Sequence, residues 1–221
     1  MTIKAVLFDI DGTLVDSNDL HVRSWSEAFR AAGQFFDDEV IHGQIGKGAD
    51  MLVPTLMPDT DAAEQERLGE AHGVVFKERY LDRVVPFPEA RELLIRVHRA
   101  GKKVVLASSA SSEELEHYVG LLDIRDIVAE TTSAADVENT KPAPDIFATA
   151  LRKVAPLGPN EVIVVGDTPY DAEAAGKCGI TAIGLRSGGF PDDALRKAGA
   201  VMLYDNTADL LAKFDTSPLA G

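Results

Sequence analysis

The fold of this chain is set by the stretch Lys4-Ala5-Val6-Leu7-Phe8-Asp9-Ile10-Asp11-Gly12-Thr13-Leu14-Val15-Asp16. Four apolar residues, Ala5 to Phe8, run directly into an acidic, glycine-containing turn. A continuous apolar run that ends in this way is typical of a buried parallel strand. In open α/β sheets, ligands bind in the crevice outside the carboxyl ends of the strands. The polar residues that follow Phe8 are therefore candidates for a functional site.

Two carboxylates stand at this strand end. If the strand direction continues through Ile10, the alternation of side chains places Asp9 and Asp11 on the same side. Carboxylates that face one point repel each other unless a cation lies between them or one of them holds a proton. The simpler interpretation is an acidic turn, because Asp and Gly are common turn residues. The rest of the chain has to decide between the two.

The composition describes a folded protein. The chain has 221 residues, of which 45% are apolar and 26% charged; this length suits one large domain, or one domain that carries a smaller one. No run approaches the roughly 18 apolar residues that a membrane span needs. The N-terminus enters a strand at once, with no room for a signal peptide, so we expect a cytoplasmic protein.

Cysteine content and charge narrow the environment and the partners. The single cysteine, Cys178, has no partner for an internal disulfide, which fits a reducing compartment. The net charge of −14 argues against nucleic acid and anionic membranes as partners. An anionic substrate would need a local positive site to bind against this overall field.

The segment after the first strand has a helical pattern. Apolar residues recur at helical spacing from about Ser17 to Gly33, and further helical stretches follow up to about Val84 without a convincing strand. We therefore predict an inserted helical domain over residues 17–85. Because it would hang over the strand ends that carry Asp9 and Asp11, it is placed to act as a lid.

Beyond residue 86, strand and helix patterns alternate. This alternation predicts an α/β fold, with a Rossmann-like parallel sheet covered by helices on both faces. The predicted core comprises residues 1–16 and 86–221. Its expected strands after the first are 103–107, 127–131, 161–165, 181–185 and 200–203.

Polar residues follow several of these strands. Ser108-Ser109, the segment around Lys141, and Gly166-Asp167 with Asp171 each stand before a predicted helix. Singly they are weak signals, since a helix cap, a solvated lysine or an ordinary turn would explain each. Jointly, at the strand ends of one parallel sheet, they are what is needed to hold a phosphate and a divalent cation.

Charge arithmetic shows why such a set would be needed. A carboxylate about 4 Å from a dianionic phosphate is repelled by roughly 8 kcal/mol at an effective dielectric constant of 20. Asp9 could attack phosphorus only if other groups offset this repulsion. A Mg²⁺ ion held by Asp9 and Asp167, together with the Lys141 ammonium, would supply three positive charges.

The motifs resemble those of the haloacid dehalogenase superfamily, in its phosphatase and phosphomutase branch with a helical cap. The resemblance covers essentially the whole chain. It is carried by four motifs in the right order, which are Asp9-Ile10-Asp11-Gly12-Thr13, Ser108, Lys141, and Gly166-Asp167 with Asp171.

This resemblance implies roles for individual residues. Asp9 matches the nucleophile that forms an aspartyl-phosphate, and Asp11 matches the general acid and base. The metal ligands would be Asp9, the main-chain carbonyl of Asp11, and Asp167, with Asp171 supporting them. The phosphate group would be bound by Ser108 and Lys141, with a backbone donor from Ser109.

The acid at position 11 favours phosphate esters as substrates, because an alkoxide leaving group needs a proton. We therefore predict a Mg²⁺-dependent phosphatase acting on a small phosphorylated metabolite. Phosphoglycolate is the preferred substrate, because Ile45-Gly46-Lys47-Gly48-Ala49-Asp50-Met51-Leu52 resembles the cap loop of that subgroup. Oligomeric state is not predicted.

Residues of the helical segment are weaker candidates. Lys47 could reach a second anionic group of the substrate, although an exposed loop lysine is an equal alternative. His21 lies where related phosphomutases carry a histidine near the acid, yet a structural role is favoured for it. Lys77 is expected to be solvated, and His42, His72, His98 and His117 show no ligand spacing.

Two other functions stay open. A sugar phosphomutase similar to β-phosphoglucomutase would use the same core, but the helical segment offers no arginine in the place where that enzyme binds the distal phosphate, so Lys47 or Lys77 would have to serve. A signalling receiver domain also combines Asp, Ser or Thr, and Lys around Mg²⁺. Receivers, however, have no helical insert after the first strand.

Overall fold

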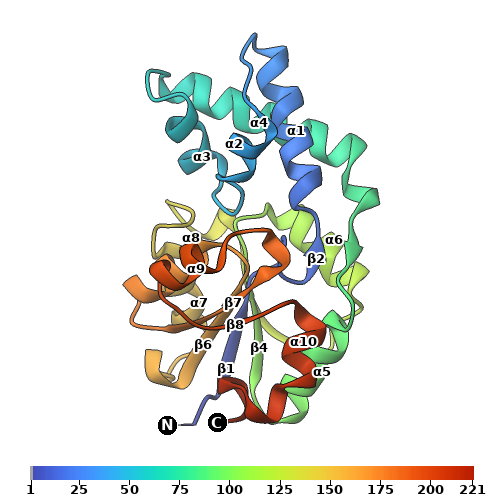
Figure 1. Ribbon diagram of the computed structural model, residues 1–221, viewed down its shortest axis with the longest axis vertical. Coiled ribbons are helices and arrows are strands. Elements are labelled where there is room, and N and C mark those ends of the chain that lie inside the picture. Colours follow the sequence, from blue (N-terminus) through green and yellow to red (C-terminus); the bar gives the residue numbers. More distant parts are fainter. Residues whose placement is uncertain (1) are drawn as a thin grey trace.

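The computed structural model describes residues 2–221 and contains a six-stranded, wholly parallel sheet. Its strands lie in the order β5-β4-β1-β6-β7-β8. The first strand, β1 (Ala5–Phe8), is therefore central, with β4 and β6 as its neighbours (Figure 1). The other strands are β4 (Lys103–Ala107), β5 (Val128–Thr132), β6 (Val162–Gly166), β7 (Thr181–Leu185) and β8 (Ala200–Tyr204).

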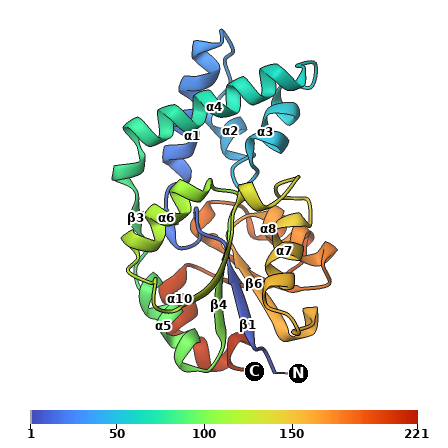
Figure 2. The same ribbon diagram turned by 180° about the vertical axis from the view of Figure 1, so that it is seen from behind.

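Helices cover both faces of this sheet, as Figure 2 shows from behind. Side chains of β1 alternate between two apolar clusters: Val6 and Phe8 belong to one, Ala5 and Leu7 to the other. The first cluster includes α5 (Ala90–Arg99), α6 (Ser112–Leu121) and α10 (Thr207–Ala212), and the second includes α7 (Asp145–Lys153), α8 (Pro169–Lys177) and α9 (Asp192–Ala198). The predicted α/β fold is thus confirmed.

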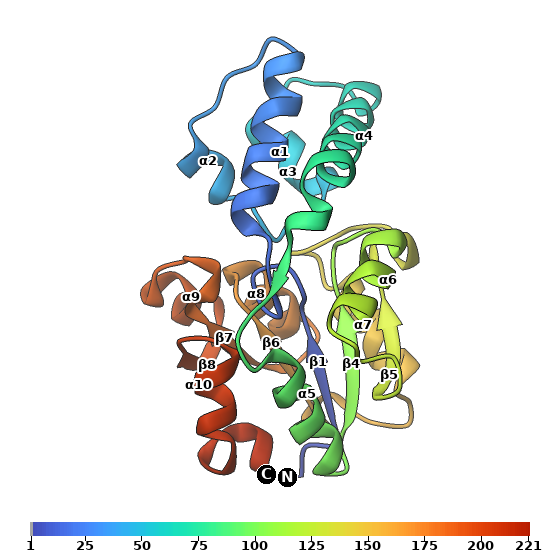
Figure 3. The same cartoon turned by 90° about the vertical axis from the view of Figure 1, so that its right-hand side faces the viewer.

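The helical segment lies beyond the carboxyl ends of the strands (Figure 3). Its helices are α1 (Asn18–Ala31), α2 (Asp38–His42), α3 (Ala49–Leu56) and α4 (Ala62–Arg79), which share their own apolar cluster around Trp25, Phe29 and Leu68. Two short antiparallel strands, β2 (Val15–Asp16) and β3 (Val85–Pro86), join it to the rest of the chain. The sequence did not predict this pair. Each strand of the pair has only two residues, which is too short for a periodic pattern in the sequence.

Within residues 2–221, no helix combines the length and the apolar character that crossing a membrane requires. α4 stops at Arg79, and a 3₁₀ turn, Leu81–Arg83, leads into β3.

Candidate functional site

Asp9 occupies the end of the central strand. β1 ends at Phe8, yet the Asp9 amide still donates to the carbonyl of Val165 on β6, at 2.9 Å, so the backbone is held in line with the sheet. Its side chain is 2% exposed. The Asp9 carboxylate accepts a hydrogen bond from Lys141 Nζ at 2.5 Å. The predicted nucleophile therefore sits where the ends of β4 and β6 flank it.

Lys141 connects two carboxylates. It is fully buried, and its ammonium lies 2.5 Å from Asp9 Oδ1 and 2.7 Å from Asp171 Oδ1. Burial alone would lower the pKa of Lys141, but the charges of Asp171 and Asp9 outweigh it and raise that pKa above its ordinary value. Lys141 is thus a fixed positive charge beside Asp9.

Asp171 is itself oriented by the start of α8. One of its oxygens accepts hydrogen bonds from the backbone amide of Thr168, at 3.0 Å, and from the Thr168 hydroxyl, at 2.6 Å. This reciprocal capping arrangement satisfies the first turn of the helix. The other oxygen is left for Lys141.

Asp167 lies at the end of β6 and is fully buried. It accepts hydrogen bonds from Thr13 Oγ1 at 2.7 Å and from Asn18 Nδ2 at 3.0 Å. Burial first, and the charge of Asp171 second, raise its pKa to about 7. Its position is also closed in by backbone, because a Cβ added at Gly12 or Gly188 would lie 2.2 or 2.1 Å from Asp167 Oδ2.

The acidic cluster fits a divalent cation. Asp9, Asp167 and Asp171 each offer an oxygen, and these oxygens lie within 4.8 Å of one another. Three carboxylates face one ammonium here, and burial raises the pKa of Asp9 well above its usual value in spite of Lys141. A hard cation with oxygen ligands would relieve this excess of negative charge. The side chain of Asp11 is not part of the cluster.

Asp11 lies beyond the end of β1, where the chain turns back toward Val15. Its Oδ1 atom accepts hydrogen bonds from Ser17 Oγ at 2.7 Å and from Tyr118 Oη at 2.9 Å, and it lies 3.1 Å from His21 Nε2. Burial would raise the pKa of Asp11, but His21, Ser17 and Tyr118 together lower it. Asp9 and Asp11 line the same cavity, although β1 ends at Phe8 and does not continue through Ile10 as the alternation assumed.

His21 belongs to a group of stacked rings from α1 and α4. Its ring stacks on Phe76 at 3.8 Å between centroids, and its Nδ1 lies 3.3 Å from His72 Nε2. His72 in turn stacks on Trp25 at 4.1 Å. Burial lowers the pKa of His72, whereas Asp11 raises the pKa of His21 against the effect of burial. Asp11 therefore favours the protonated form of His21.

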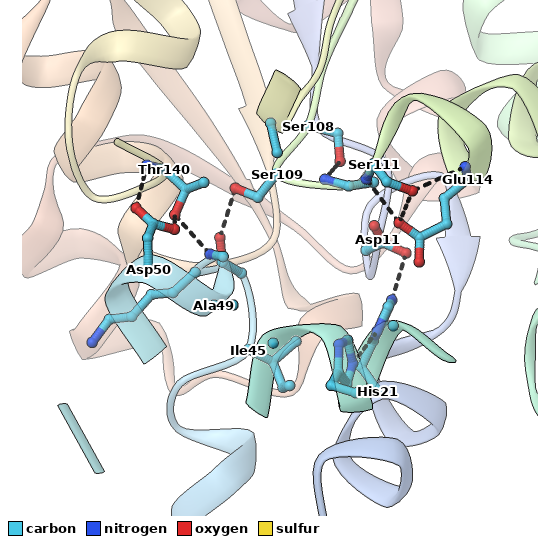
Figure 4. Close-up of a pocket in the computed structure, with 18 of the residues that line it drawn as sticks. Asp11, His21, Ile45, Ala49, Asp50, Ser108, Ser109, Ser111, Glu114 and Thr140 are labelled. Carbon is cyan, nitrogen blue, oxygen red and sulfur yellow. Dashed lines mark hydrogen bonds and ion pairs between the residues drawn. The ribbon is translucent and has the colours of Figure 1, made fainter. Parts of the chain in front are cut away.

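A cavity of about 410 Å³ lies between the sheet and the helical segment. Asp9, Asp11, Ser108 and Ser109 line it from the strand ends; Figure 4 shows the last three. Ser108 is buried and accepts a hydrogen bond from the Ala110 amide at 3.1 Å. The four residues predicted at the ends of β1 and β4 are thus brought to one cavity, while Lys141, Asp167 and Asp171 stand behind Asp9.

The loop before α3 contacts the core directly. The Gly48 amide donates to Thr140 Oγ1 at 2.8 Å, and Asp50 accepts from the Thr140 amide at 2.8 Å and from its hydroxyl at 2.6 Å. Ser109 Oγ also donates to the carbonyl of Gly46, at 3.3 Å. The helical segment therefore meets the residue that precedes Lys141.

The two lysines considered on the helical segment line the cavity, but each ammonium is engaged elsewhere. Lys47 Nζ donates to Gln44 at 2.6 Å and to Thr55 at 3.2 Å, and lies 4.7 Å from the centre of the Tyr170 ring. Lys77 forms an ion pair with Glu113 at 2.6 Å. Lys77 is therefore paired, although we expected it to be solvated.

Several residues of the site escaped the sequence analysis. Thr13 and Asn18 bind Asp167, Tyr118 binds Asp11, and His72 contacts His21. Thr13 belongs to the opening motif, and Asn18 lies at the start of the predicted helical segment. Tyr118 and His72 carry no local signal, because their contacts span 107 and 51 residues.

The family model described as haloacid dehalogenase-like hydrolase matches residues 3–179 of this chain. A crystal structure of a hydrolase from Pseudomonas syringae superimposes with a TM-score of 0.90 at 31% identity, covering 97% of this chain and 98% of that one. The phosphoglycolate phosphatase of Salmonella typhimurium is 26% identical over 95% of this chain and 91% of its own length. The protein CbbY of Cereibacter sphaeroides is 28% identical over 99% of this chain and 100% of its own length.

Proposed function

We propose that this chain, which belongs to the haloacid dehalogenase-like hydrolases, is a Mg²⁺-dependent phosphatase that hydrolyses a small phosphorylated metabolite through an aspartyl-phosphate. One observation carries the proposal. Asp9 lines a cavity while Lys141 holds its carboxylate in a buried acidic cluster. The relative named phosphoglycolate phosphatase supports the same reaction class.

In the first step, an oxygen of Asp9 attacks phosphorus and the bond from phosphorus to the ester oxygen breaks. The departing oxygen needs a proton. Asp11 and His21 hold one between them, since the pKa of Asp11 is lowered and that of His21 is raised. Asp11 delivers this proton to the leaving alcohol.

In the second step, Asp11 takes a proton from water, and the water oxygen attacks the phosphorus of the aspartyl-phosphate. The bond between phosphorus and Asp9 breaks, which releases phosphate and restores the carboxylate. Lys141 offsets the negative charge of the phosphoryl group, and Ser108 and Ser109 lie where they can donate to its oxygens.

Asp9 and Asp167 would hold the Mg²⁺ ion, together with the main-chain carbonyl of Asp11, and Asp171 would orient Lys141. When bound, the ion supplies positive charge next to the phosphoryl group. Residues 17–85 would serve as a cap that excludes water from the cavity, because the loop containing Gly48 already meets Thr140.

Phosphoglycolate remains the first substrate to test, since the loop around Lys47 resembles that subgroup. A phosphomutase is the second candidate, because both reactions would begin with the same transfer to Asp9. Isomerisation of β-glucose 1-phosphate in the presence of a bisphosphate primer would favour it. The receiver-domain alternative is not retained, because the chain belongs to a hydrolase family.

The decisive experiment measures phosphate release from p-nitrophenyl phosphate and a panel of phosphate esters, with and without Mg²⁺. We expect Mg²⁺-dependent turnover that Asp9→Asn lowers by at least about a thousandfold, because the nucleophile is lost. Asp16→Asn, at the exposed residue of β2, is the matched control. Full activity of Asp9→Asn, or no phosphate release from any ester, would refute the proposal.

A further inference from the structure

One carboxylate in the cavity takes no part in the proposed chemistry. Glu114, in the first turn of α6, is 6% exposed and lines the cavity. Its Oε2 atom accepts hydrogen bonds from the Ser111 amide at 2.7 Å and from the Ser111 hydroxyl at 2.6 Å. Within residues 2–221, no donor reaches its other oxygen, Oε1. Half of this buried carboxylate is therefore free to accept a hydrogen bond.

The free oxygen belongs to the part of the cavity where the leaving group would lie. Figure 4 shows Glu114 on the same side as Asp11 and His21, across from Asp50 and Thr140. The charge of Glu114 also contributes to the raised pKa of His21, which requires the two groups to be close. Asp11 protonates the leaving oxygen in the proposed reaction, so the remainder of the leaving alcohol passes near Glu114.

The basic side chains that line the cavity already contact other groups of the protein. Lys77 pairs with Glu113, and Lys47 donates to Gln44 and Thr55. His21 contacts Asp11 and His72 through its two ring nitrogens. Among the described residues, the lysine next to Glu114 is thus paired with a carboxylate and Lys47 is held by neutral acceptors on the loop before α3, so a second anionic group beside Glu114 would meet its charge directly.

We infer that Glu114 is a specificity-determining residue that accepts a hydrogen bond from a hydroxyl or ammonium group of the leaving alcohol. It thereby selects esters of polyols or amino alcohols over esters whose leaving group carries a carboxylate. A donor on the substrate gains a hydrogen bond to a charged acceptor, whereas a carboxylate is repelled in a poorly solvated cavity. The inference rests on the proposed phosphatase function and assigns it a substrate class other than phosphoglycolate.

Three esters of equal length test this inference. They are ethylene glycol monophosphate, O-phosphoethanolamine and 2-phosphoglycolate, which end in a hydroxyl, an ammonium and a carboxylate. With Mg²⁺ present, we expect kcat/KM for phosphoglycolate to be at least about tenfold below that of the other two, the discrimination that one buried polar contact supplies. An ester that is not turned over is ranked by its inhibition constant against p-nitrophenyl phosphate, with the same tenfold criterion.

The variant Glu114→Gln removes the charge but keeps the helix cap, because Gln can replace Glu at this position of a capping box. We expect it to bring phosphoglycolate to within about threefold of ethylene glycol monophosphate, since the like-charge repulsion is gone. Glu116→Gln is the matched control. Glu116 lies on the same helix, is exposed and pairs with Arg125, so its variant should leave the ratio unchanged.

Two results would overturn the inference. One is a wild-type enzyme that prefers phosphoglycolate, and the other is a ratio that Glu114→Gln does not change. Either result is distinct from failure of the proposed function, which would appear as no turnover of p-nitrophenyl phosphate by the wild-type protein. Thermal unfolding of Glu114→Gln checks that the variant is folded.

Discussion

Asp9 and Asp11 stand two residues apart, yet their surroundings are built from different parts of the molecule. Asp9 contacts Lys141 and lies near Asp167 and Asp171, all of which follow core strands. Asp11 is held by Tyr118 from α6, but also by Ser17 and His21 at the beginning of the helical segment. The core alone therefore fixes Asp9, whereas the position of Asp11 depends on both parts of the chain.

The two environments also shift the pKa values of the two carboxyl groups in opposite directions. Burial, together with the neighbouring carboxylates, raises the pKa of Asp9, while His21, Ser17 and Tyr118 lower the pKa of Asp11 against the effect of burial. Pairs of carboxylates whose environments push their pKa values apart are characteristic of sites with divided roles. A cation held by Asp9 and Asp167 would lower the pKa of Asp9, as a nucleophile requires, whereas the lowered pKa of Asp11 means that its acid role depends on a proton shared with His21.

Lys141→Met should have the largest effect on stability and turnover. It leaves the buried carboxylates of Asp9 and Asp171 without their cation, so we expect the free energy of unfolding to fall by about 3 kcal/mol, together with loss of turnover. Urea denaturation measures the first effect. Lys4→Met, which removes an exposed ion pair with Glu161, is the control and should cost less than about 1 kcal/mol. A loss below about 1 kcal/mol for Lys141→Met would contradict a tightly coupled core cluster.

Gly12→Ala tests how closely the turn that follows Asp11 must pack against Asp167. Gly12 has a φ of +73°, and its added Cβ would lie 2.2 Å from Asp167 Oδ2. We expect a loss of roughly 2 to 4 kcal/mol in unfolding free energy, from left-handed strain plus overpacking. Gly33→Ala separates the two causes, because Gly33 has a φ of +76° but no atom within 4 Å of an added Cβ. Equal losses for both variants would show that Asp167 is free to move.

The sequence predicted the core half of the site better than the half that includes Asp11. Apolar runs mark the strands, and parallel strands bring the residues after them to one edge, so Asp9, Ser108 and Asp167 could be assigned from position alone. The family and the hydrolase class predicted from these motifs are confirmed by the family model. The cap and core boundaries and the roles of the individual residues stay predictions.

The surroundings of Asp11 could not be predicted in the same way. Tyr118 and His72 lie inside helices, where a tyrosine or histidine on a partly apolar face is equally typical of ordinary packing. Their contacts depend on how α6 and α4 are placed, which is a tertiary result. The alternation argument placed Asp9 and Asp11 at one site, and both line the cavity, but its premise, a strand that continues through Ile10, does not hold.

Tyr118→Phe tests the one contact of Asp11 that comes from the core, and leaves the contacts with Ser17 and His21 in place. The variant removes the 2.9 Å hydrogen bond to Asp11 Oδ1. We expect kcat/KM for an alkyl phosphate to fall about tenfold, as part of the general-acid contribution, but much less for p-nitrophenyl phosphate, whose leaving group needs little protonation. Tyr80→Phe is the matched control. The Tyr80 hydroxyl donates to Glu27 Oε1 at 2.5 Å, and neither residue lines the cavity. An equal loss on both substrates would mean a purely structural role for Tyr118.

The smallest effect should be a pH-dependent contribution of His21 to stability. Asp11 first, and Glu114 to a lesser extent, raise the pKa of His21 in the folded state against the effect of burial. Protonated His21 therefore stabilises the fold fully below its unfolded pKa, about 6.5, and this stabilisation is lost as pH rises through the folded pKa. His21→Gln should consequently cost more unfolding free energy at pH 6 than at pH 9. In an Asp11→Asn background this pH dependence should shrink, because the main charge that holds the proton on His21 is gone. A cost that is unchanged between the two pH values would mean that packing on Phe76, and not the ion pair with Asp11, is what His21 contributes.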